Sequence, residues 1–285
     1  MTYGACFGDV VGAPSEFSGA PRDVATMELA RSDYDCTDDS ILTCTVAKAL
    51  TDWDGRDDDA FVELLSRRFV VDVHDYPGVS WGTRFVEWAL AGGRGSYGSF
   101  GNGSAMRVSP VAWWASDESG VLRLARLTAL PTHSHPEGIR GAQAVALAVF
   151  MARMGSSKQK IRAALEARFD GDDGAFPYDL SRSVDDIVAS GYGINETCQH
   201  SVPEALCAFF DDSSVDYEST LRSTLRLGGD ADTQCAMTGA IAEAMFGMPE
   251  GYEQNERERL RRVGLLDRLE AFEKACPAYR DRRRT

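Results

Sequence analysis

Two short segments concentrate carboxylates in front of apolar-periodic stretches. The first is TDDS at residues 37–40, and the second is GGDADT at residues 228–233. Asp, Ser and Thr are preferred helix N-caps, and acids there complement the helix dipole, so capping explains either segment taken alone. Capping needs only one side-chain oxygen per helix, however, and each segment offers several.

Together, two such segments could form a metal-binding site. If the fold joins them, Asp38, Asp39, Asp230 and Asp232 share one site. A pair of like charges ~4 Å apart costs on the order of 4 kcal/mol at an effective dielectric near 20, so four carboxylates need cations to stay ionised. Oxygen ligands without His or Cys favour Mg²⁺, Mn²⁺ or Ca²⁺ over Zn²⁺.

Three further segments carry polar groups on predicted turns. GDVVGAPSEF (8–17) leaves Glu16 on a loop after a short helix, where a surface acid is the alternative. GNGSAMR (101–107) exposes backbone N–H groups to an anion, although a Gly-rich loop alone is also an ordinary turn. Tyr97 and Phe100 precede it and would either stack on a base or pack. THSHPEG (132–138) contains His133 and His135, and each of them would either contact a ligand or play a structural role.

Helical periodicity recurs along the chain, while strand alternation is scarce. The pattern predicts an all-α fold, a single compact multi-helix domain over residues 1–285, with 279–285 a frayed basic tail. The Trp113-Trp114 pair and the cysteines are expected in the core. The expected helices are Ser40–Asp52, Asp58–Val71, Thr83–Ala91, Val121–Leu130, Glu137–Met154, Lys158–Arg168, Val202–Phe210, Tyr217–Leu227, Thr233–Phe246 and Arg257–Cys276.

Composition excludes several classes of protein. The chain is 44% hydrophobic and 26% charged, as in ordinary globular proteins, and no apolar stretch approaches the ~18 residues of a membrane span. A net charge of −14 argues against nucleic-acid binding, the basic residues 280–284 being a local exception. Seven cysteines without a Cys-x-x-Cys pair, and no basic leader, predict a cytoplasmic protein with reduced thiols. We expect a monomer.

Taken together, these segments resemble the ADP-ribosylglycohydrolase family, which includes dinitrogenase reductase-activating glycohydrolases. The resemblance runs in order from GDVVGAPSEF (8–17) through TDDS (37–40), GNGSAMRVSP (101–110) and THSHPEG (132–138) to LGGDADT (227–233). It implies an all-α fold with a dinuclear Mg²⁺ or Mn²⁺ site at helix N-termini. Ser40 and Ala231 differ from many relatives, but neither is an implied ligand.

The resemblance also implies roles for individual residues. The metal ligands would be Thr37, Asp38, Asp39, Asp230, Asp232 and Thr233. Substrate contacts would come from Asn102, Gly103, Ser104, Met106, Arg107 and His135. Glu16 matches the acidic residue near the metals, and Glu16 and Asp38 are both candidates for the carboxylate that handles the proton.

The implied reaction is hydrolysis at C1″ of the distal ribose, which releases ADP-ribose from a protein or small-molecule acceptor. Arginine is the favoured acceptor, with serine, another residue, a nucleic-acid end or a metabolite as alternatives. Two other functions remain open: a non-catalytic ADP-ribose or nucleotide binder on the same fold, and a His-Asp metal phosphohydrolase suggested by His74-Asp75. The latter needs more His ligands than four histidines readily provide.

Overall fold

The computed structural model describes residues 2–30, 34–171 and 175–278, and the regular secondary structure of that part consists of helices. A single isolated bridge between Gly101 and Thr197 is the β contact found there. The helices are α1 Tyr3–Gly12, η1 Ala13–Ser15, α2 Asp38–Asp52, α3 Asp58–Asp75, α4 Thr83–Leu90, α5 Gly103–Met106, α6 Ser109–Trp114, α7 Glu118–Ala129, α8 Pro136–Arg153, α9 Lys158–Arg168, α10 Val184–Ala189, α11 Cys198–Phe210, α12 Tyr217–Leu225, α13 Ala231–Phe246, α14 Glu250–Arg262 and α15 Leu266–Ala275.

The all-α prediction is confirmed, and most predicted helices agree with the structure to within four residues at either end. The prediction of one helix over Arg257–Cys276 is wrong. The chain breaks between α14 and α15 at Gly264, whose φ of +77° lies in the left-handed region that glycine favours. The short helices α5, α6 and α10 were not predicted, because four to six residues are too few to show periodicity. The predicted tail 279–285 lies outside the described residues.

Helices α1 and α13 cross so closely that glycine is required at their contact. A Cβ on Gly8 would lie 2.0 Å from the carbonyl oxygen of Cys235, and one on Gly12 would lie 2.2 Å from that of Ala231. Real side chains never approach backbone this closely. The glycines of α1 therefore set its last turn directly against the first turn of α13, where the second acidic segment lies.

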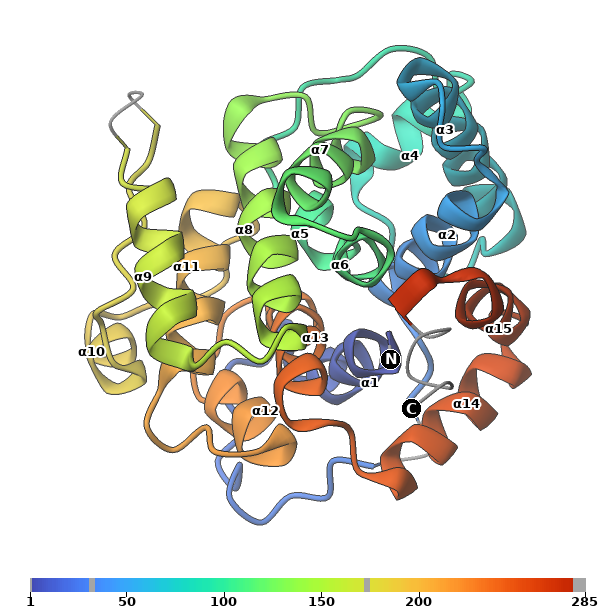
Figure 1. Cartoon of the computed structure of the whole chain (residues 1–285). Coiled ribbons are helices and arrows are strands. Elements are labelled where there is room, and N and C mark those ends of the chain that lie inside the picture. Colours follow the sequence, from blue (N-terminus) through green and yellow to red (C-terminus); the bar gives the residue numbers. More distant parts are fainter. Residues whose placement is uncertain (1, 31–33, 172–174, 279–285) are drawn as a thin grey trace.

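The remaining helices pack around this pair (Figure 1). Helices α2, α3 and α15 lie on one side of α1 and α13, and α8, α9 and α11 lie on the other. Most cysteines and Trp113 are buried, and Cys36 and Trp114 are partly buried against the core. None of the described helices has an apolar stretch long enough to cross a bilayer.

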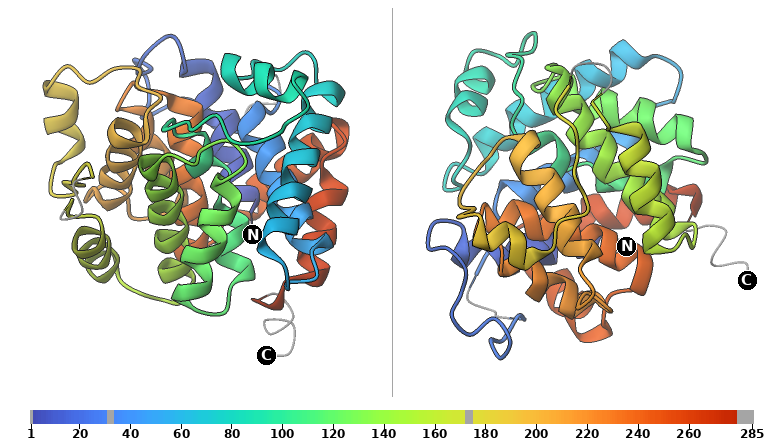
Figure 2. Two further views of the ribbon diagram at one scale, coloured as in Figure 1. Left: turned by 90° about the horizontal axis from the view of Figure 1, so that it is seen from above. Right: turned by 90° about the vertical axis from the view of Figure 1, so that its left-hand side faces the viewer.

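Segments that are distant in sequence gather at one end of the bundle. The left panel of Figure 2 shows the dark-blue segment after α1, the turquoise helix α4 and the gold segment after α10 at the top of the view. The start of α2 and the start of α13 face the same space. This end of the bundle holds the candidate site.

Candidate active site

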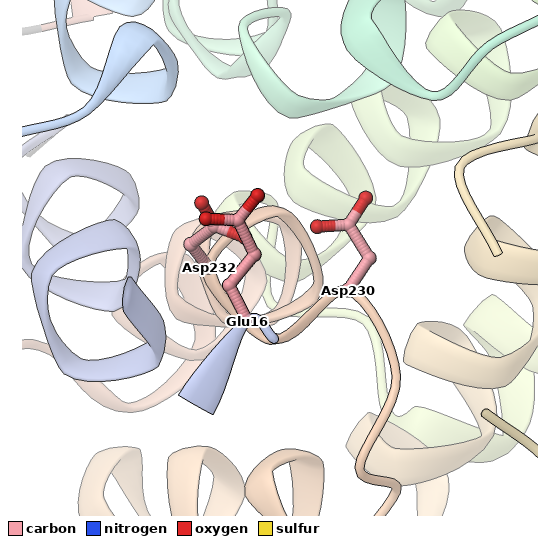
Figure 3. Close-up of side chains that lie close together, drawn as sticks. All are labelled: Glu16, Asp230 and Asp232. Atoms are coloured by element: carbon pink, nitrogen blue, oxygen red, sulfur yellow. The ribbon is translucent and has the colours of Figure 1, made fainter. Parts of the chain in front are cut away.

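The two acidic segments meet in the structure. Thr233 Oγ1 of α13 lies 3.4 Å from Asp39 Oδ2 of α2, which joins segments 194 residues apart. Glu16, which follows η1, faces the same point. Carboxylate oxygens of Glu16, Asp230 and Asp232 lie within 4.8 Å of one another, and Figure 3 shows the three side chains converging from the end of η1 and the start of α13. The condition for a shared carboxylate site is therefore met.

Asp9, in the middle of α1, fixes the start of α2. Its fully buried carboxylate accepts hydrogen bonds from Thr37 N at 3.0 Å, Thr37 Oγ1 at 2.8 Å and Ser40 N at 3.1 Å, and a fourth from Ser40 Oγ. No role was predicted for Asp9, since nothing in the local sequence distinguishes it from an ordinary helical acid. The structure makes it a positioning residue for the first acidic segment.

Helix capping accounts for only part of the acidic segments. Thr37 is the N-cap of α2, and its side chain accepts from Asp39 N at 3.2 Å. Asp39 instead turns inward. Asp230 is the N-cap residue of α13 but makes no side-chain capping bond; it accepts from Asn102 Nδ2 at 2.6 Å. Capping alone therefore leaves the carboxylates of Asp39 and Asp230 unexplained.

The clustered acids perturb one another's protonation. Burial, followed by the charges of Asp230 and Glu196, raises the pKa of Glu16 to about 7. Burial and the charge of Asp9 raise the pKa of Asp38 to about 8. The pKa values of Asp39 and Asp232 are also raised, first by burial and then by neighbouring acids. Without a counter-charge, the folded protein holds protons here.

The donor set fits hard divalent cations. All candidate ligand atoms are oxygens, which suits Mg²⁺ or Mn²⁺. Among the described residues, Asp39 Oδ1 is buried with no hydrogen-bond partner, a costly arrangement unless a cation completes it. The ligand set implied by the sequence therefore remains a prediction that the arrangement supports.

A cleft of about 450 Å³ opens above the carboxylates. Four of the predicted substrate contacts line it, namely Asn102, Gly103, Met106 and Arg107. Ser104 does not: it is fully buried, and its hydroxyl donates to the Gly138 carbonyl at 2.6 Å. Tyr97 lines the cleft, whereas Phe100 is 43% exposed outside it.

His133, rather than His135, faces the cleft. Arg107 donates to Thr132 Oγ1 at 2.8 Å, and the Thr132 hydroxyl and His133 Nδ1 share a hydrogen bond at 2.7 Å. Burial, and then the charge of Arg107, lowers the pKa of His133 well below its usual value. The ring is therefore neutral, and its Nε2 faces Gly103 at the cleft. His133 presents this nitrogen as a hydrogen-bonding group to a ligand.

His135, a predicted substrate contact, does not line the cleft. His135 is exposed and is the N-cap of α8, where its Nδ1 accepts from Glu137 N at 3.2 Å. Its ring packs edge-on against Phe100. The physical reason is local: one residue of the His-x-His pair begins the helix, so the other turns inward. His133 is the histidine of this pair that lines the cleft.

Two charged residues of the cleft escaped sequence analysis. Arg84, exposed on α4, donates to the Tyr97 carbonyl at 2.7 Å and lies over the Tyr97 ring at 4.9 Å. Glu196 lines the cleft from the segment before α11. Both come from stretches without a motif. Arg107, by contrast, is buried, and its guanidinium lies 4.5 Å from the centre of the Phe69 ring.

The His74-Asp75 pair plays no part in this arrangement. Both residues are exposed in the last turn of α3, and neither lines the cleft. The position gives no support to a His-Asp phosphohydrolase site.

A cleft floored by carboxylates from two helix starts, and walled by amide, imidazole and guanidinium groups, is suited to a polar, anionic ligand. The chain belongs to the ADP-ribosylglycohydrolase family, whose profile matches residues 1–282. It is a glycosyl hydrolase of the kind that acts on ADP-ribose linkages. The recognition from sequence motifs is confirmed.

Individual relatives agree with this assignment. The chain is 28% identical to ADP-ribosylhydrolase ARH3 of Danio rerio in an alignment 314 residues long, which covers 86% of this chain and 81% of that protein. It is 32% identical to ADP-ribosylhydrolase ARH3 of Homo sapiens over 197 residues, 55% of this chain and about half (54%) of that protein. A solved structure, an ADP-ribosylglycohydrolase-related protein complex, superposes with a TM-score of 0.70 at 22% identity over 98% of this chain and 95% of that chain, which supports the fold.

Proposed function

We propose that the protein hydrolyses the bond between C1″ of the distal ribose of ADP-ribose and an acceptor side chain, with arginine as the first acceptor. The observation that carries the proposal is the meeting of two acidic segments, 194 residues apart, beneath Asn102 and Gly103. The substrate carries an anionic diphosphate and a polar distal ribose, and the cleft offers complementary groups for both.

The site is proposed to hold two Mg²⁺ or Mn²⁺ ions on Thr37, Asp38, Asp39, Asp230, Asp232 and Thr233. Bound cations would supply charge neutralisation and Lewis acidity toward the ribose hydroxyls and the attacking water. The orphaned Asp39 Oδ1 and the raised pKa values of the site carboxylates support this proposal.

The protein's own groups bind and orient the nucleotide part of the substrate. His133 would hydrogen-bond the substrate through Nε2, and Asn102 Nδ2 holds Asp230 in place while also donating to Ser201 Oγ at 3.0 Å. Arg84 would pair with the diphosphate, because a guanidinium matches phosphate geometry and its positive charge offsets the acidic cleft.

Glu16 is proposed as the general base. It would take a proton from the attacking water as the water oxygen bonds to C1″; the C1″–acceptor bond breaks, and the proton held by Glu16 passes to the leaving acceptor. A pKa near 7 suits proton transfer at neutral pH. Asp38, with a pKa of about 8 and a position on the same floor, is the alternative.

A second candidate function is ADP-ribose binding without turnover. The same cleft would serve it, and the intact set of six oxygen ligands favours the enzyme. The seven cysteines are thiols rather than disulfides, which supports the proposal that the protein works in a reducing compartment such as the cytoplasm.

The test is incubation with matched ADP-ribosyl-arginine and ADP-ribosyl-serine peptides, with Mg²⁺, with Mn²⁺ and with a chelator, followed by mass spectrometry. We expect release of ADP-ribose that depends on metal and is faster from arginine. Tight ADP-ribose binding with no release from either peptide would favour the binder instead.

A further inference from the structure

A second cavity reaches the same carboxylates from another direction. It has a volume of about 390 Å³ and lies between residues 35–38, the turn 76–80 after α3, and Val263 at the end of α14. Four residues line both this cavity and the nucleotide cleft, namely Glu16, Asp38, Ser80 and Asp232. The two spaces therefore flank the carboxylate floor.

The shape of the substrate assigns an occupant to each space. In an ADP-ribosylated acceptor, the adenosine, diphosphate, distal ribose and acceptor follow one another along a line, and the bond that breaks joins the last two. The glycine, amide and imidazole groups of the cleft serve the nucleotide end, so the distal ribose lies over the shared carboxylates. We infer that the second cavity receives the acceptor side chain, an inference that rests on the proposed hydrolase function.

The lining of the second cavity favours a long cationic side chain. No Lys or Arg is among the described residues that line it, while Asp35 stands at its mouth with its side chain 73% exposed. Asp35 lies 3.5 Å from the exposed Arg262, a loose surface pair that leaves the carboxylate accessible. Partly buried Tyr76 and Val79 would pack against methylene groups, as in an arginine stem.

Two glycines provide a matched test of the division. Gly78 lines only the second cavity and Gly82 only the nucleotide cleft; at each, an added Cβ meets nothing within 4 Å, and neither has positive φ. Gly78→Trp should leave the calorimetric Kd for ADP-ribose within about twofold and lower kcat/KM on an ADP-ribosyl-arginine peptide about 100-fold, the scale of a misplaced reacting group. Gly82→Trp should weaken ADP-ribose binding itself by about tenfold or more.

Unchanged turnover of the peptide by Gly78→Trp, in a preparation that binds ADP-ribose normally, would overturn the assignment. Retained ADP-ribose binding also shows that the variant is folded. A different result would refute the proposed function: the wild-type protein would release ADP-ribose from neither peptide, with or without metal. The assignment of the acceptor cavity would then be refuted as well.

The charge at the mouth is tested separately. Asp35→Asn should lower kcat/KM for the arginine peptide by about two- to fivefold, the scale of an exposed ion pair, and leave the serine peptide unaffected. Asp54→Asn, at an exposed turn residue that lines neither space, is the matched control and should change neither rate. Equal losses on both peptides with Asp35→Asn would overturn the cationic acceptor.

Discussion

Asp9 connects the packing of α1 with the chemistry of the site, and Asp9→Asn isolates that connection. Its Oδ2 accepts the backbone N–H groups of Thr37 and Ser40, whereas Oδ1 accepts only the Thr37 hydroxyl. An asparagine would keep its oxygen toward the amides and turn its NH₂ to Thr37 Oγ1. The hydrogen bond between Thr37 Oγ1 and residue 9 is then reversed, with Thr37 Oγ1 as the acceptor. The amide therefore occupies the Thr37 lone pair that would otherwise face a cation.

The loss of folding stability in Asp9→Asn follows from the four hydrogen bonds that the Asp9 carboxylate accepts. Hydrogen bonds to a charged acceptor are worth about 1 kcal/mol more than those to a neutral one, so about 4 kcal/mol is lost in total. Burial raises the pKa of Asp9, so removing the charge recovers part of that loss. A net loss of about 2 kcal/mol would lower Tm by about 4–8 °C in a domain of this size.

Asp72→Asn is the matched control. Asp72 is equally buried on α3 and accepts from Thr45 of α2 at 2.6 Å and from Arg268 of α15 at 2.8 Å, away from the site. Calorimetric scans with a chelator, and with Mg²⁺ or Mn²⁺ at about 100 times Kd, separate stability from metal binding, because such a ligand adds about 2.7 kcal/mol. Both variants should melt early, but only Asp9→Asn should lose most of the metal-induced rise. A wild-type rise in Asp9→Asn would refute the positioning role.

The other predictions concern single groups of the site. Asn caps helices about as well as Asp, so Asp39→Asn and Asp232→Asn should keep the circular dichroism signal and lose metal affinity and activity; unchanged turnover in both would restore the capping interpretation. Glu16→Gln should still bind ADP-ribose while single-turnover kcat falls about 10²–10⁴-fold, and full-speed turnover would exclude it as the base. Arg84→Gln should raise the calorimetric Kd for ADP-ribose about tenfold, whereas Arg94→Gln, an exposed neighbour outside the cleft, should not; equal effects would mean only general electrostatics. In chelator, the pKa of Glu16, raised from 4.5 to about 7, means that the folded state binds more protons than the unfolded state across that range, so Tm should fall as pH rises through it. The same scan on Glu16→Gln should show a smaller fall, and an identical profile would contradict this.

The sequence carried the information that lies in local patterns. Apolar periodicity and turn residues placed most helices, and the ordered motifs identified the two acidic segments and the Asn102-Gly103 turn. The choice between His133 and His135 was beyond such patterns, since it depends on which residue begins α8. The break at Gly264 was missed because apolar periodicity continues on both sides of it, although the glycine itself was a usable signal.

Groups placed only by tertiary contacts could not be predicted. Arg84 and Glu196 reach the cleft from segments with no motif, and their neighbours in space are distant in sequence. Asp9 lies within a recognised motif, yet its role depends on α2 packing against α1. Only the packed structure shows that its carboxylate faces two helix-start amides rather than water.

Helix α1 and the residues that follow it meet three structural requirements of the site within one short sequence motif. Its Gly8 and Gly12 permit contact with the backbone of α13, its Asp9 holds the start of α2, and its end delivers Glu16 to the carboxylate floor. Because α1 is short and buried along its whole length, these positions cannot move independently. A side chain at either glycine would displace Asp9 and Glu16 together, so the spacing of the segment GDVVGAPSEF is set by site geometry as much as by packing.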